Sequence, residues 1–414
     1  MTAFRIASLV ALTVCTCTIF TAAPQTTQKK KTSKKKKPAP PPVSPAQRLA
    51  ARNEIERRMA AVTTGIENPA PLANYFRALD NAAAPIHILQ FGDSQTASDD
   101  WVNAIRTLAQ VKYGDGGPGF IQAGRPYKGY RRFDASGSNS LGWKTDGNTS
   151  HPADPDQGLS HVSISTQSPG QTVQLKATGE NLGIFFLRQP AGGQFEIIAD
   201  GGQPVVVSTN GDLGPGDFSL PLPPGPHDIE LRTLHFAPVR LFGWTLDNPK
   251  GITVETLGVN GAQTTILLNA NEQIWASEVA ARAPALIILA YGTNEAISHL
   301  WTAEQYRADL TEVIARVRRA APNASILLIG PPDCGKLAAL PHLTEVIDIQ
   351  RDLANTLNVA FWDWRTQMGG PRVVTLWVRA GLSQPDCIHF TGEGYRLLGT
   401  TLFNQLEKAH QQTQ

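Results

Sequence analysis

Two patterns of hydrophobic and polar positions divide the chain. Between about residues 145 and 248, apolar and polar residues alternate in short runs such as HVSIST, TVQLKAT and VRLFGWTL, which Gly, Pro, Asn and Asp separate. Alternation with a period of two is typical of strands that bury one face, and turn residues mark their ends. This stretch is therefore predicted to be all-β, a sandwich or a jelly roll.

On both sides of this stretch, buried strands are predicted in alternation with helices. The run PALIILAY is almost continuously apolar, as strands of a parallel sheet are when helices cover both of their faces. The order of strand and helix predicts a parallel α/β sheet that the β stretch interrupts. The predicted strands cover residues 85–91, 252–257, 284–291, 325–329 and 359–362.

Helix starts are indicated by capping residues. Ser44 precedes Pro45 and has Gln three positions on, which predicts a helix to about Ala61. Ser98 is expected to cap a helix that Gly114 stops, and the run TAEQ at residues 302–305 predicts a further capping box. Two more helices are expected at residues 344–357 and 395–406.

The N-terminal segment has the pattern of an export signal. An apolar run follows Arg5 and ends in small residues, which is typical of a secretory signal over residues 1–23. Cleavage there would leave Pro24 first, a poor context for a signal peptidase, so an uncleaved anchor is the alternative. Residues 24–44 are rich in Lys and Pro and predict an extended linker, either a plain spacer or a contact with anionic lipid or wall polymer. We expect an exported protein, periplasmic or associated with the cell envelope.

Composition and charge narrow the class of protein. The chain of 414 residues is 41% apolar and 17% charged, which fits a globular protein with one catalytic domain and a smaller module. The first 44 residues hold eight of the 37 basic residues and no acidic one, so the remainder has 29 basic against 35 acidic residues. A mildly acidic body argues against nucleic-acid binding. We expect a monomer.

Ser94 is the candidate nucleophile. In the sequence FGDS it directly follows a predicted buried strand, at the carboxyl edge of the sheet where open α/β folds build their sites. A Gly-Asp-Ser tripeptide by itself is more often a plain turn. The assignment therefore depends on a base and on an orienting acid elsewhere in the chain.

His389 is the candidate base. In the sequence PDCIHF it has a carboxylate three residues before it, on a short loop that a helix follows. At this spacing one turn brings the Asp386 carboxylate to the histidine Nδ1 and leaves Nε2 free to face Ser94. A surface Asp-His turn is the alternative. His410 has Glu407 at the same spacing, but we expect that pair at the frayed end of the last helix, in a polar tail.

Two further strand ends offer donors for an oxyanion, which ester hydrolysis requires. In GVNGAQT, Gly261 lets the backbone approach closely, and in YGTNE the amide of Asn294 ends the most buried strand. Either segment alone is an ordinary turn. Together with Ser94 and His389 they supply, at strand ends, each residue type that the reaction needs.

The four segments FGDSQT, GVNGAQ, YGTNE and DCIHF occur in this order and resemble the four signature blocks of the SGNH hydrolase superfamily. The resemblance covers roughly residues 84–145 and 251–410. It implies a flavodoxin-like three-layer α/β/α domain, formed by residues 45–144 and 249–414, with residues 145–248 inserted as a separate all-β domain.

The same resemblance implies roles for five residues. Ser94 attacks the ester, His389 acts as general base and then as general acid, and Asp386 orients it. The implied oxyanion hole consists of the backbone N–H groups of Ser94 and Gly261 and the side chain of Asn294.

Within the superfamily, the stretch YGDGGPGF…GRPYKGY and the β insert resemble the two-domain O-acetylpeptidoglycan esterases, whose inserted module is similar to a carbohydrate-binding module. This resemblance implies a serine esterase that removes O-acetyl groups from cell-wall glycan through an acetyl-enzyme on Ser94. The alternatives are an O-acetyltransferase, an esterase for another polysaccharide such as xylan, and a glycan-binding protein without activity. The sequence does not separate hydrolase from transferase, because they differ in whether water or a sugar takes the acyl group.

Cysteines and histidines suggest no further chemistry. Cys334 and Cys387 both follow predicted strand ends, and in an oxidising compartment they form either a bridge or two isolated buried thiols. The histidines are scattered and no Cys/His spacing fits zinc, so neither a metal nor a cofactor is expected.

Overall fold

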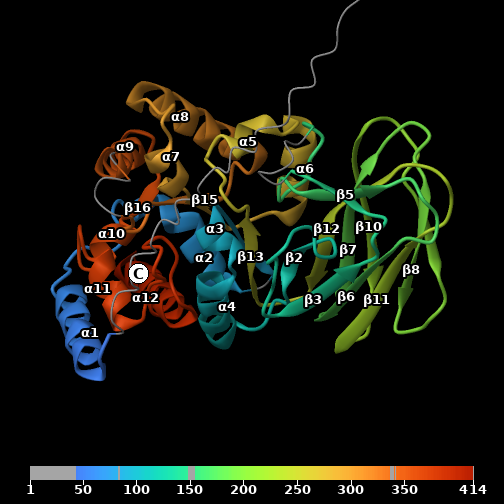
Figure 1. Ribbon diagram of the computed structural model, residues 1–414. Helices are drawn as coiled ribbons and strands as arrows, with labels where there is room; N and C mark the ends of the chain where they lie inside the picture. Colours follow the sequence, from blue (N-terminus) through green and yellow to red (C-terminus); the bar gives the residue numbers. More distant parts are fainter. Residues whose placement is uncertain (1–42, 83, 148–153, 336–339, 341, 414) are drawn as a thin grey trace, which may run out of the picture. The chain divides into compact units, whose positions relative to one another are not determined.

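The computed structural model describes residues 43–82, 84–147, 154–335, 340 and 342–413 (Figure 1). Residues 43–414 group as one compact unit. The expected signal and nearly all of the expected linker lie outside the described residues. Among the helices of the described part, none is both long and apolar enough to cross a membrane.

A five-stranded parallel sheet lies at the centre of the predicted α/β part. Its strand order is β13-β1-β14-β15-β16, and every neighbouring pair is parallel. Numbered along the chain, this is the flavodoxin-like order 2-1-3-4-5, so the expected parallel sheet is confirmed. The strands are β1 (Ile86–Gly92), β13 (Ile252–Gly258), β14 (Leu286–Ala290), β15 (Ser325–Ile329) and β16 (Ala360–Trp362).

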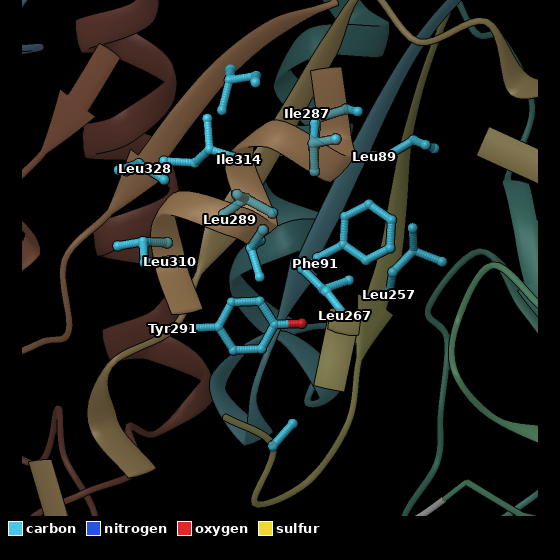
Figure 2. Packing of buried hydrophobic residues seen from close by; sticks show 14 of the residues in the cluster. Leu89, Phe91, Leu257, Leu267, Ile287, Leu289, Tyr291, Leu310, Ile314 and Leu328 are labelled. Atoms are coloured by element: carbon cyan, nitrogen blue, oxygen red, sulfur yellow. The ribbon is translucent and has the colours of Figure 1, made fainter. Parts of the chain in front are cut away.

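Helices cover both faces of this sheet and give three layers. Leu89 and Phe91 of β1 pack with α6 (Glu272–Arg282), α8 (Ala303–Ala320) and α9 (Leu343–Thr356). Figure 2 shows this side, with Leu289 of β14 and Leu310 of α8 among the residues of one hydrophobic cluster. The opposite face packs against α1 (Pro45–Ala60), α2 (Ala73–Asn81), α4 (Asp100–Tyr113), α11 (Val374–Ala380) and α12 (Gly392–Thr413).

Several helix starts are as expected. Ser44 and Gln47 form a reciprocal capping box at the start of α1, and Thr302 accepts a hydrogen bond from the Gln305 N–H at the start of α8. The capping box expected at residues 302–305 is incomplete among the described residues. The Gln305 side chain does not bond back to the Thr302 backbone but donates to Asp309. The remaining short helices are η1 (Ala70–Leu72), α3 (Ser94–Ala97), α5 (Ile266–Asn269), α7 (Thr293–Ile297) and α10 (Trp364–Gln367).

Two helix ends differ from the expectation. The helix expected after Ser98 is present as α4 and stops at Gly114, but its N-cap is Asp99, whose φ is +60°, and Ser98 instead ends α3. The last helix does not fray before His410: α12 continues to Thr413, and His410 is buried, stacks on Phe76 and bonds to Asp80 at 3.0 Å. Tertiary packing against α2 decides this end, which a polar tail sequence does not reveal.

Two antiparallel sheets account for the alternating stretch. One has the order β10-β7-β12-β5-β4, with β2 also pairing with β12, and the other has the order β3-β6-β11-β8-β9. Residues from both sheets form one hydrophobic cluster, so the two sheets pack face to face. The strands are β2 (Gly119–Gln122), β3 (Ala135–Asn139), β4 (Lys144–Asp146), β5 (Ser163–Thr166), β6 (Thr172–Thr178), β7 (Asn181–Arg188), β8 (Gln194–Ala199), β9 (Val205–Ser208), β10 (Gly214–Pro221), β11 (Pro226–Thr233) and β12 (Val239–Asp247).

The antiparallel sheets begin earlier than the alternating pattern does. Strands β2 and β3 belong to them although they precede residue 145. The sheet that contains β12 is also covered on its second face, because Phe185 and Phe242 join the hydrophobic cluster of Trp275 and Val279 on α6. This sheet therefore contacts the α/β part directly.

Candidate active site

Ser94 is the first residue of α3, immediately after β1. Asp93 caps this short helix, since its Oδ1 accepts the Gln95 N–H at 2.9 Å. The turn is tight: a Cβ on Gly92 would come within 2.2 Å of Thr96 Oγ1 and 2.8 Å of the Ala290 carbonyl. Only glycine fits this position, and Ser94 is thereby held at the carboxyl end of the sheet.

The structure brings Ser94, His389 and Asp386 together. Ser94 Oγ lies 2.9 Å from His389 Nε2, and His389 Nδ1 lies 2.9 Å from Asp386 Oδ2. With the proton on Nδ1, the ring donates to the carboxylate and accepts from the serine hydroxyl. These distances are those of a nucleophile, a base and an orienting acid within hydrogen-bond reach.

The surroundings of Asp386 favour its ionised form. Its Oδ1 accepts the backbone N–H groups of Ile388 and His389, at 2.9 and 3.0 Å. Partial burial raises the pKa of Asp386, but the hydrogen bonds from the His389 ring and from these two N–H groups outweigh it and lower the pKa. The side chains of His389 and Asp386 remain 40% and 47% exposed, so the chain of hydrogen bonds opens to solvent.

Two residues outside the expected set hold the histidine loop in place. Gln95 Nε2 donates to the Ile388 carbonyl at 2.8 Å, and Gln95 Oε1 accepts from the Tyr395 hydroxyl at 2.6 Å. Gln95 is buried, and it follows Ser94 directly. It therefore connects the serine turn with the loop before His389. The sequence placed Gln95 in the first block, but only the contacts across some 290 residues show what its amide binds.

The two expected donor segments lie against each other. Asn294 Nδ2 donates to the Ala262 carbonyl at 2.9 Å and lies 3.4 Å from Asp93 Oδ2. Gly261, the neighbour of Ala262, has a φ of +76°, a conformation that favours glycine. Among the described residues, neither Gly261 N–H nor Ser94 N–H donates to a protein acceptor. Asn294 thus lies next to the Gly261 segment and next to the serine turn.

Two buried acids, Asp93 and Glu295, lie close to Asn294 and the segment after Gly261. Burial raises the pKa of Asp93 to about 7, helped by the nearby Glu295 and opposed by the Gln95 N–H. Burial also raises the pKa of Glu295, although its Oε1 accepts both the N–H and the hydroxyl of Thr264. A neutral Asp93 places no full negative charge beside Asn294 below about pH 7.

One cluster of possible metal ligands, away from Ser94, is filled by an arginine. His87, Asp247 and Glu255 lie close enough to share an ion. The Arg282 guanidinium already donates to all three, with distances of 2.6 Å to Asp247 and to Glu255. Burial raises the pKa of Glu255, but Arg282 outweighs this and lowers it to about 2. The cluster is therefore an ion pair with Arg282.

The two cysteines among the described residues are separate thiols. Cys334 and Cys387 are free and buried. Of the two open interpretations, the structure has the isolated thiols and no bridge. Burial raises the pKa of the Cys334 thiol well above its usual range, which makes its thiolate scarce.

Comparisons with known proteins agree with the fold. Residues 235–397 match the model of the GDSL-like lipase/acylhydrolase family. The solved structure of a peptidoglycan O-acetylesterase aligns with a TM-score of 0.71 and 26% sequence identity, over 83% of this chain and 96% of that one. No curated protein matches this sequence.

Carbohydrate esterases are also among the similar solved structures. A family two carbohydrate esterase from Cellvibrio japonicus has 13% identity and a TM-score of 0.29 over 68% of this chain and 100% of its own. Another, from Clostridium thermocellum in complex with cellohexaose, has 14% identity and a TM-score of 0.32 over 70% of this chain and 98% of its own. The family match and the structure with the TM-score of 0.71 confirm the resemblance to SGNH, or GDSL-like, acylhydrolases.

Proposed function

We propose that this chain, a carboxylic ester hydrolase that resembles the GDSL-like acylhydrolases, removes O-acetyl groups from peptidoglycan through an acetyl-enzyme on Ser94. The observation that carries the proposal is the continuous hydrogen-bonded chain from Ser94 through His389 to Asp386, with 2.9 Å at each link. Such a chain is the arrangement that activates a serine hydroxyl.

In the first half of the reaction, Ser94 Oγ attacks the acetyl carbonyl carbon while His389 Nε2 takes the hydroxyl proton. Asp386 keeps the other ring proton on Nδ1 and stabilises the imidazolium that forms. The bond between the carbonyl carbon and the sugar oxygen then breaks. His389 returns its proton to that oxygen, so that the sugar leaves as an alcohol and the acetyl group stays on Ser94.

The negative charge on the carbonyl oxygen requires donors, and three are proposed. They are the backbone N–H groups of Ser94 and Gly261 and the amide of Asn294. The support is that both backbone groups lack a protein acceptor among the described residues and that Asn294 lies against Ala262, the neighbour of Gly261. Donors that are fixed before the reaction stabilise the developing charge without the cost of reorganising water.

In the second half, a water molecule attacks the acetyl carbon and His389 takes its proton. Collapse of the intermediate releases acetate and returns the proton to Ser94 Oγ. A sugar hydroxyl in place of this water would make the enzyme an acetyltransferase. Hydrolysis is proposed because the aligned structure with the TM-score of 0.71 is that of an esterase.

Peptidoglycan as the substrate rests on two observations. The structure aligned over 83% of this chain is that of a peptidoglycan O-acetylesterase. The His389 and Asp386 side chains are each at least 40% exposed, which suits a polymer better than a deep pocket for a small ligand. Action on peptidoglycan also requires export, in agreement with the signal expected at residues 1–23.

The antiparallel sheets are proposed to form a separate glycan-binding module. The support is that none of Ser94, Gly261, Asn294, Asp386 and His389 lies in them, while the sheet with β6 and β11 exposes polar residues on its outer face. This outer face and its loops are proposed to position the polymer. The boundaries 145 and 248 become about 119 and 247, because β2 to β12 all pair within these sheets.

Acetate release tests the proposed function. The purified protein is incubated with O-acetylated peptidoglycan and with O-acetylated xylan, and Ser94→Ala serves as the control for each. We expect acetate from peptidoglycan at a clearly higher rate than from xylan, and none above background from the control. Equal rates on both polymers would remove the support for peptidoglycan as the substrate, and transfer of labelled acetate to a glycan would favour the transferase.

A further inference from the structure

We propose that the loop of residues 125–131 forms a cationic rim beside Ser94 that binds a carboxylate of the glycan substrate. The loop has the sequence RPYKGYR and connects β2 with β3. It has no part in the proposed bond-making steps. The proposal rests on the proposed function, because it concerns how the same site selects its substrate.

The loop is anchored to the segment that carries the nucleophile. Arg131 Nε donates to the Ser98 carbonyl at 2.9 Å, and the Ser98 N–H donates to the Ser94 carbonyl at 3.2 Å. Directly after the loop, the Phe133 N–H donates to Asp99 Oδ2 at 2.9 Å. One end of the loop therefore lies one helical turn from Ser94.

The middle of the loop is anchored to the segment that carries Gly261. The Tyr127 hydroxyl donates to the Gly258 carbonyl at 3.3 Å. Gly258 in turn touches α3, since a Cβ on it would lie 2.2 Å from the Ala97 N atom. The loop thus lies against two of the three strand ends that are proposed to supply oxyanion donors.

Within the loop, the two tyrosines are packed and two cations are exposed. Tyr130 is buried and its hydroxyl accepts the Gln122 N–H at 3.1 Å, while Tyr127 packs against it edge-on with 5.5 Å between the ring centres. Arg125 and Lys128, by contrast, are exposed. The tyrosines fix the backbone, so the two cations are presented from a held loop.

The positive charge of the loop indicates what kind of ligand it would bind. Among the described residues, neither the Arg125 guanidinium nor the Lys128 ammonium group has a hydrogen-bond or ion-pair partner, whereas Arg131 is paired with Asp100. Both cations lie on one short loop, three residues apart. They attract an anion to the mouth of the site and leave a neutral ester unaffected. Peptidoglycan strands provide such an anion, since their lactyl and peptide substituents end in carboxylates.

The test compares three substrates: O-acetylated peptidoglycan fragments with free carboxylates, the same fragments after amidation of their carboxylates, and p-nitrophenyl acetate. The variant is Arg125→Gln combined with Lys128→Gln. Lys250→Gln is the matched control, because Lys250 is an exposed cation that precedes β13, at the opposite end of the strand from Gly258.

We expect the double variant to lower kcat/KM on the free-carboxylate fragments by about three- to tenfold, mainly through KM, since each exposed pair contributes little. Activity on the amidated fragments and on p-nitrophenyl acetate should change by less than about twofold. The difference should shrink between about 20 mM and about 500 mM salt, which screens exposed charges. The Lys250→Gln protein should match the wild type on all three substrates.

An unchanged kcat/KM on the free-carboxylate fragments, or an equal loss on all three substrates, overturns the rim. A wild-type protein that releases no acetate from peptidoglycan instead overturns the proposed function. In that case the same variants are compared on acetylated glucuronoxylan, whose carboxylate is a uronate. A loss confined to the uronate-bearing fragments supports the carboxylate rim, and no loss removes it.

Discussion

The parallel sheet and the antiparallel sheets differ in where they keep their polar residues. At the carboxyl end of β1 and β14, buried polar side chains gather around Ser94, among them Asp93, Gln95 and Glu295. In the antiparallel sheet with β6 and β11, polar residues alternate outward along each strand, and pairs such as Lys176 with Asp228 lie in solvent.

The difference follows from what covers each sheet. Helices bury the parallel strands on both faces, so a polar group reaches a substrate only where a strand ends. The site lies at the switch in strand order, since β13 and β14 run on either side of β1. An antiparallel sheet with one solvated face offers instead a broad polar surface. The first region suits the proposed bond making, and the second suits the proposed binding of glycan.

The largest effect is expected for the hydrogen-bonded chain itself. Ser94→Ala or His389→Ala should lower kcat on p-nitrophenyl acetate by at least about a thousandfold, because each removes an indispensable part of the acyl-transfer unit. Circular dichroism should show an unchanged fold. Near-normal turnover of the purified Ser94→Ala protein would exclude this mechanism and with it the division between the two regions.

Asn294→Ala is expected to lower kcat by about a hundred- to a thousandfold with little change in KM, because an oxyanion donor acts in the transition state. Steady-state kinetics on p-nitrophenyl acetate measure both constants. If only KM rises, Asn294 binds substrate and does not stabilise the oxyanion.

Gln95 should act through His389 and not on the substrate. Gln95→Met removes the bonds to the Ile388 carbonyl and the Tyr395 hydroxyl, and we expect kcat to fall about ten- to a hundredfold as the imidazole loses its fixed position. Tyr395→Phe keeps the bond to Ile388 and is the matched control, with a smaller loss. Equal losses in both variants, with KM rather than kcat affected, would contradict a positioning role.

The thermal stability of the protein is expected to depend on the contact between α6 and the segment that joins β4 to β5. Glu278 lies on α6 and its Oε2 accepts the Leu159 N–H at 2.6 Å, and burial raises its pKa to about 8. The unfolded chain releases this proton near the ordinary pKa of 4.5, so between about pH 4.5 and 8 the folded state binds more protons and stability falls as pH rises.

Glu278→Gln removes this dependence. We expect the variant to melt a few degrees above the wild type at pH 8.5 and close to it at pH 4. Thermal unfolding followed across this pH range measures the difference. Asp93, whose pKa is also raised, contributes to the same fall. A wild-type melting temperature that does not fall between pH 5 and 8 would mean that Glu278 is ionised in the folded protein.

The smallest effect is expected on the antiparallel sheets. Phe236 is 86% exposed on the loop between β11 and β12, and Phe236→Ala should lower acetate release from intact peptidoglycan by up to about tenfold if its ring stacks on a sugar. Hydrolysis of p-nitrophenyl acetate should be unchanged, because so small an ester does not reach this surface. Folded loop variants that lose both activities in equal proportion would show that these sheets shape the catalytic site.

The sequence alone predicted the five parallel strands, several of the helices and strands around them, and the chemistry of the blocks. Period-two alternation separated the antiparallel strands from the apolar parallel ones, because burial on one face or on two faces leaves different patterns. Strand ends located Ser94, Gly261 and Asn294, since substrates reach polar groups where parallel strands end. His389 was located by the carboxylate three residues before it, on a loop that a helix follows. Short-range geometry was enough for Asp386, three residues from His389.

Tertiary structure alone decided the contacts between distant segments. The amide of Gln95 meets the His389 loop, Arg282 fills the space between His87 and Glu255, and His410 is buried against Phe76. The start of the antiparallel sheets at β2 also depends on its pairing with β12, more than a hundred residues later. Local patterns report the burial of a residue, but the partner of a buried polar group is chosen by packing between segments that the chain order does not relate.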